Sequence, residues 1–91
     1  MRIEFAYVPG SNNRAIGVVV VVKQHVLNDD RLARDVRQQL GRVRDFRGLS
    51  VTLMATEGRG RVRYLGDPKL VRQLAGIDAL ALPWRTATIA A

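Results

Sequence analysis

The chain contains no cysteine and only one histidine, His25. Without cysteine, disulfide bonds, thiolate nucleophiles and Cys-ligated zinc or iron–sulfur sites are excluded. A single histidine cannot supply a His pair to a metal ion, and no Ser–His–Asp spacing accompanies it. We therefore predict no metal and no cofactor. The question of enzymatic activity stays open, and the lack of a convergent catalytic set favours a protein without one.

Long apolar runs are also absent. The longest, residues 15–22, falls far short of the roughly 20 residues that span a bilayer. No small-residue cleavage site follows it, as one would follow a signal peptide. Its valines are typical of a strand rather than of a signal-peptide core. Aromatic residues make up only 5% of the chain, too few for an obvious base-stacking platform. We expect no membrane partner and a cytoplasmic location.

Acidic residues are few, since 8 Asp and Glu are set against 15 Lys and Arg. The net charge is +7 and the pI is near 11.3, and a field of this sign attracts nucleic acids or acidic partners. All but two of the basic residues are arginine, whose planar guanidinium donates two hydrogen bonds to one phosphate. A GC-rich coding sequence produces the same bias, so the charge favours nucleic-acid binding without establishing it.

The 91 residues, 47% of them hydrophobic, suit a single domain over residues 1–91 with one core. Alternation along residues 2–8 predicts a half-buried strand that ends at Pro9-Gly10. The β-branched run Ile16–Val22 predicts a central strand that is covered on both faces. It should also have neighbours on both sides, because such a run at an edge would aggregate. Five further elements are predicted from local signals. A helix capped by Asn28 runs to about Arg44 or Phe46, and a second helix starts at Asp67-Pro68. The strands are 49–56, its hairpin partner 62–65 and a last strand at 86–90.

The element order β-β-α-β-β-α-β predicts the α+β class and a two-layer sandwich. After the first strand the order βαββαβ matches a ferredoxin-like core, which we favour. The alternative is a thioredoxin-like layout that uses strands two to four and both helices.

The sharpest functional feature is the alternation of Arg59, Arg61 and Arg63. On a strand these three side chains would point to one face and form a row of phosphate-binding groups. An edge strand protected by charge against edge-to-edge pairing explains the same pattern. Arg31, Arg34 and Arg42 form a second basic element, opposite the apolar stripe of the first helix. A solvated outer face, as in any amphipathic helix, again explains it equally well.

Lys23 and His25 lie between the carboxyl end of the central strand and the first helix. Ligands often bind at this place in open sheets. Asp29 and Asp30 at the helix start would repel an anion there, so we interpret His25 as a structural or surface residue.

We therefore predict a small basic, non-catalytic module that binds nucleic-acid phosphates without sequence preference. Its candidate binding residues are Arg59, Arg61, Arg63, Arg31, Arg34 and Arg42. The alternative is a protein-interaction or homo-oligomeric domain. Its contact surface would be the first or last strand, expected near the sheet edges, or Trp84 and its neighbours.

Overall fold

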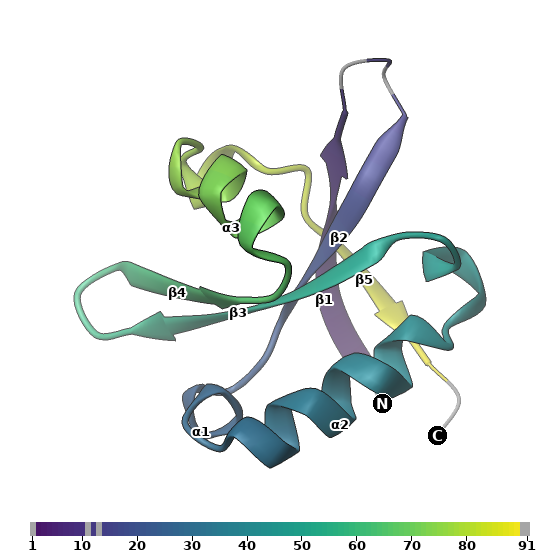
Figure 1. Ribbon diagram of the computed structural model, residues 1–91. Helices are drawn as coiled ribbons and strands as arrows, with labels where there is room; N and C mark the ends of the chain where they lie inside the picture. Colours follow the sequence, from purple (N-terminus) through teal and green to yellow (C-terminus); the bar gives the residue numbers. More distant parts are fainter. Residues whose placement is uncertain (1, 11, 13, 90–91) are drawn as a thin grey trace.

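A computed structural model describes residues 2–10, 12 and 14–89, and Figure 1 shows their arrangement. The strands in this part of the chain are β1 (Arg2–Pro9), β2 (Ala15–Val21), β3 (Ser50–Glu57), β4 (Arg61–Leu65) and β5 (Arg85–Thr88). The helices are α1 (Gln24–Leu27), α2 (Asp30–Gly41) and α3 (Pro68–Ala75), with short 3₁₀ turns at Arg44–Phe46 and Ala79–Ala81. The protein thus has the predicted α+β composition, built around one mixed sheet.

β2 lies in the middle of the sheet, whose strand order is β4-β3-β2-β1-β5. On one side β2 pairs antiparallel with β1, where Val18 is opposite Tyr7. On the other side it pairs parallel with β3, where Val18 is opposite Val51. β-branched residues suit such a position because they pack well on a pleated surface with neighbours on both sides. The prediction of an interior strand is confirmed.

β1 also lies inside the sheet, between β2 and β5. Its Phe5 is opposite Val20 on one side and opposite Arg85 on the other. The expectation that the first strand lies near an edge is therefore wrong, and the edge strands are β4 and β5. The turn-forming residues after Pro9 allow β2 to pair directly with β1. The other side of β1 is then available to β5, which makes β1 an interior strand.

Helices cover both faces of the sheet, so the fold has three layers and the predicted two-layer sandwich is wrong. Figure 1 shows α1 and α2 on one side and α3 on the other. The α1/α2 face contains Val18 and Val20 in its core, whereas Val19 packs with Leu70 and Leu74 of α3. Successive strand residues point to opposite faces. Because β2 carries valine on both faces, each face requires a cover.

The strand connections differ from those of the favoured ferredoxin-like core. That split βαβ arrangement places another strand between the two parallel strands, whereas β2 and β3 pair directly. β1 occupies the other side of β2, so neither β4 nor β5 can lie there. The thioredoxin-like alternative covers β2 to β4 with two helices and leaves β1 and β5 unaccounted for. Element order does not determine which strands pair, and this is where the prediction failed.

The first helical region is divided, with Asp29 rather than Asn28 as the cap of α2. The Asp29 carboxylate accepts a hydrogen bond from the Leu32 amide at 3.1 Å. Residues 24–27 form the separate short helix α1, and α2 ends at Gly41, before the predicted end at about Arg44 or Phe46. The Asn28 side chain instead accepts a hydrogen bond from Arg63.

The later elements follow the predictions closely. The Asp67 carboxylate accepts from the Lys69 amide at 2.9 Å and Pro68 begins α3, as expected for an Asp cap followed by proline. The predicted strand 86–90 corresponds to β5 at Arg85–Thr88, and Ala90 lies outside the described residues. No helix in the described part of the chain combines the length and apolar composition needed to cross a membrane.

Candidate nucleic-acid interface

The hairpin between β3 and β4 does not present three arginines in a row on a strand. Glu57 is opposite Arg61, where β4 begins. Arg59 lies in the intervening turn with a φ of 58°, and Gly60 follows with a φ of 79°. The left-handed region is uncommon for residues other than glycine, so the tight turn takes Arg59 out of the strand's alternation. Only Arg61 and Arg63 share a strand face.

Arg63 is engaged in holding the fold together. Its Nη1 donates to the Asn28 Oδ1 at 2.8 Å, and its Nη2 donates to the carbonyl oxygen of Leu27 at 3.3 Å. The Glu57 carboxylate lies 3.5 Å from the same guanidinium. These contacts tie β4 to the turn between α1 and α2, and they engage both terminal nitrogens of the guanidinium. Arg63 is therefore a structural residue, which its place in the Arg-rich run did not indicate.

The different environments of Arg61 and Arg63 lead to a prediction with opposite outcomes for two similar variants. Arg63→Gln should lower the free energy of unfolding by about 1 kcal/mol, or roughly 5 °C in melting temperature, because hydrogen bonds between elements are lost. Arg61→Gln should leave the melting temperature almost unchanged, since Arg61 is exposed. Thermal denaturation of both variants measures the difference. Equal destabilisation of the two would contradict the structural role of Arg63.

Arg31, Arg34 and Arg42 are exposed on α2 and at its end, as predicted. They do not form one compact cluster, because Arg31 and Arg42 are separated by about 16 Å along the helix axis. Arg31 and Arg34 lie near the start of α2, three and six residues after Asn28, which Arg63 contacts. Arg42 lies at the other end, beside a shallow hollow that Thr88 also lines. The structure thus groups Arg31 and Arg34 with the β4 side of the molecule.

The acidic side chains leave most of the positive charge uncompensated. Among residues 2–10, 12 and 14–89, the one ion pair within 4.0 Å joins Arg63 and Glu57. Asp29, Asp67 and Asp78 instead accept backbone N–H groups at the starts of helical segments. There they interact with the positive ends of helix dipoles rather than with arginine. The positive charge of the exposed arginines is therefore largely not neutralised by neighbouring carboxylates.

Arg37 is a further structural arginine that the periodicity did not identify. Its Nε donates to the carbonyl oxygen of Val51 at 3.0 Å. In the part of the chain that the structure describes, the pairing of β4 with β3 runs from Leu53–Leu65 toward the hairpin tip, so Val51 lies beyond the last of these pairs. Arg37 of α2 donates to this carbonyl oxygen, so one nitrogen of its guanidinium is engaged within the fold.

The aromatic side chains are turned inward. Phe5 and Phe46 are buried and pack edge to face, with ring centroids 5.1 Å apart. Tyr7, Tyr64 and Trp84 are half-buried. Burial, together with the nearby charge of Asp78, raises the pKa of Tyr64 above its usual value of 10.0. None of these rings is exposed for base stacking, so the surface offers charge rather than aromatic contacts.

Trp84 is tied to its own segment by its indole Nε1, which donates to the carbonyl oxygen of Ala79 at 2.8 Å. Its ring packs against the core under α3. Both the indole N–H and the ring of Trp84 are thus engaged in contacts within the fold.

The described residues contain no group of three or more His, Cys, Asp or Glu side chains placed to hold a metal ion. His25 is exposed on α1. The structural features that stand out are therefore the uncompensated arginines of α2 and the hairpin. Comparison of the chain with protein-family models, with curated proteins and with solved structures finds no match to any of them.

Proposed function

We propose that this protein binds nucleic acid through the phosphate backbone, without sequence preference. The binding surface consists of Arg59 and Arg61 on the hairpin, Arg31 and Arg34 at the start of α2, and Arg42 at the C-terminal end of α2. The observation that supports it is that these five side chains are exposed. Within the described residues none of them has a hydrogen-bond or ion-pair partner. We name this set the arginine surface.

The contact between Arg63 and Asn28 supports placing the hairpin arginines close to Arg31 and Arg34, whereas Arg42 lies at the other end of α2. Arg61 precedes Arg63 by two residues and shares its face of β4. Arg31 follows Asn28 by three residues, across the Asp29 cap of α2. The 2.8 Å hydrogen bond between Arg63 and Asn28 therefore holds Arg61 and the start of α2 near each other.

Phosphate recognition fits this surface better than base recognition does. Guanidinium groups bind phosphate oxygens in a bidentate manner, and such contacts carry no direct sequence information. Asp35 lies one turn after Arg31, but the two make no ion pair within 4.0 Å among the described residues. The guanidinium of Arg31 thus keeps its hydrogen-bonding capacity.

The proposal is tested by titrating labelled oligonucleotides of two unrelated sequences with wild-type protein at several salt concentrations. Because binding releases counterions, log affinity should fall linearly with log salt, by about 0.9 per phosphate neutralised on duplex DNA. The two sequences should give the same slope and affinity. Absence of binding at about 50 mM salt and micromolar protein would refute the proposal, since non-specific binders reach that range.

A homo-oligomeric domain is the second candidate, and the edge position of β5 favours it. Among the described strands β5 pairs with β1 alone, and most of its residues are exposed. An edge strand of this kind can pair with the same strand of a second copy. Sedimentation analysis over a wide concentration range measures this, and a monomer at every concentration would exclude it.

A further inference from the structure

β1 and β2 separate at one end of the sheet. Within the described residues, their pairing ends at Phe5 and Val20. Residues before Phe5 pair with β5, as Glu4 does with Thr86, whereas Val21 pairs with Met54 of β3. Beyond this point β1 is paired with β5 and β2 is paired with β3. Figure 1 shows the chain after β2 turning away from β1 toward α1.

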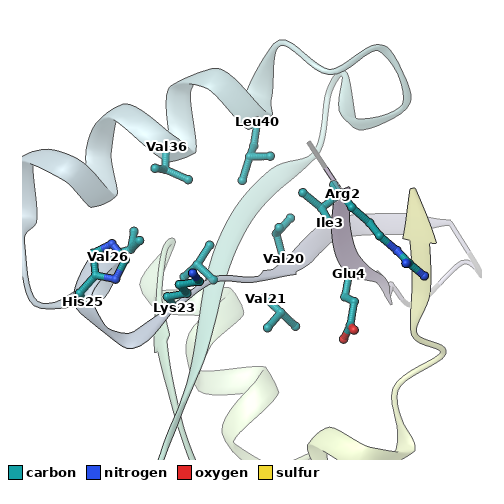
Figure 2. A pocket seen from close by; sticks show the side chains of 11 residues that line it. Arg2, Ile3, Glu4, Val20, Val21, Lys23, His25, Val26, Val36 and Leu40 are labelled. Carbon is teal, nitrogen blue, oxygen red and sulfur yellow. The ribbon is translucent and has the colours of Figure 1, made fainter. Parts of the chain in front are cut away.

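A hollow of about 480 Å³ opens where the two strands separate. Figure 2 shows that side chains from four elements surround it: Ile3 of β1, Val20 of β2, Val26 of α1 and Val36 and Leu40 of α2. Its volume lies within the range of about 300–1,000 Å³ that is usual for small-molecule sites. Because these walls are aliphatic, the interior suits an apolar group.

Charged groups stand at the mouth of this hollow. Lys23 and His25 are exposed on the α1 side, and Arg2 and Glu4 are exposed on the β1 side. Figure 2 shows Lys23 and His25 close to Val26, with Glu4 on the opposite side. In the part of the chain that the structure describes, none of the four has a side-chain hydrogen bond or ion pair.

The charge at the mouth favours an anion. Lys23 is the cation on the α1 side, whereas Arg2 and Glu4 lie on the β1 side, where their opposite charges offset each other. Asp29 and Asp30, which the sequence suggested would repel an anion, do not line the hollow. The Asp29 carboxylate is instead occupied by the Leu32 amide. An ammonium group with three donors thus stands beside an apolar interior.

We propose that this hollow binds a small carboxylate with an apolar body, an aliphatic monocarboxylate of about the size of octanoate. The Lys23 ammonium donates to the carboxylate, with the His25 ring beside it. The aliphatic chain lies against Ile3, Val36 and Leu40, where its removal from water provides the driving force. The proposal is independent of nucleic-acid binding, because none of these residues belongs to the arginine surface.

The test is a methyl-detected NMR titration of the wild-type protein with octanoate up to about 5 mM, enough to load a site with a Kd of about 1 mM. Saturable shifts should concentrate on the methyl groups of Ile3, Val20, Val36 and Leu40. Octylamine has a chain of the same length and the opposite charge, so it should bind more weakly. Lys23→Gln, a surface change, should weaken octanoate binding about three- to tenfold through loss of a charge-assisted hydrogen bond.

A second pair of variants tests the interior of the site. Val36→Phe should fill the hollow and remove the octanoate shifts, whereas Val71→Phe, at a half-buried valine of α3, should leave them unchanged. Melting curves show whether both variants are folded. Absence of saturable shifts in the wild type, equal binding of octylamine, or undiminished binding by Lys23→Gln would each overturn the proposal.

Discussion

Replacing Val18 with aspartate is expected to leave the chain unfolded at neutral pH. Val18 is 0% exposed on the central strand and lies between Tyr7 of β1 and Val51 of β3. An unpaired carboxylate at such a position costs on the order of 5 kcal/mol or more. The total stability of a domain of this size is about 5–10 kcal/mol. Circular dichroism and thermal melting should therefore show no cooperative transition.

The matched control for this change is Val62→Asp. Val62 lies on the edge strand β4 and is 36% exposed, so the new carboxylate remains hydrated. This variant should keep a cooperative transition and lose less than about 1 kcal/mol. If Val18→Asp instead melted like the wild type, the central position of β2 would be incorrect.

The second large effect is expected from three arginines of the proposed surface. Changing Arg31, Arg34 and Arg61 to Gln lowers the net charge from +7 to +4, since three positive charges are lost. Loss of three phosphate contacts should make the salt dependence shallower by up to about 2.7 units. At about 50 mM salt this corresponds to roughly a 100-fold loss of affinity or more. Fluorescence anisotropy with a labelled oligonucleotide measures both quantities.

A second triple variant separates the position of the charges from their number. Arg14, Lys69 and Arg72 are exposed and lie outside the arginine surface, two of them on α3 across the sheet. Changing them to Gln also gives a net charge of +4. This control should lose affinity no more than about threefold, through the weaker long-range field. Equal losses in both triple variants would show that net charge alone, without a defined surface, accounts for binding.

The local elements were largely predictable because their signals lie within a few residues. The β-branched run marked β2 as an interior strand, and Asp67-Pro68 marked the start of α3. The cover on both faces of β2 was predicted from the same run, although the two-layer sandwich did not provide for it. Val18 and Val19 point to opposite faces and are both 0% exposed, so a run without polar alternation requires two covering layers.

Strand pairing was not predictable from the same patterns. Alternation shows which residues share a face, but it does not identify the neighbouring strand. β1 pairs with β2, and β5 pairs with β1, in place of the ferredoxin-like strand pairing that was expected. The hollow between β1 and β2 depends on where pairing ends, at Phe5 and Val20, and no local signal marks that point.

The candidate site was only partly accessible to sequence reasoning. Exposure of Arg31, Arg34 and Arg42 follows from helical periodicity, and the structure agrees. Arg63 differs, because its partners Leu27 and Asn28 lie more than thirty positions earlier in the chain. A contact of that range leaves no periodic signal. Only the fold distinguishes this arginine from the neighbouring Arg61.

The most direct test of the arginine surface is an amide NMR map of the wild-type protein, with and without an unlabelled oligonucleotide at low salt. We expect the shifted amides to cluster at the start of α2, around Arg31 and Arg34, and at the hairpin around Arg59 and Arg61. High salt should reverse these shifts, because the contacts are made to phosphates. Shifts centred on α3, or spread evenly over the molecule, would contradict the proposed surface.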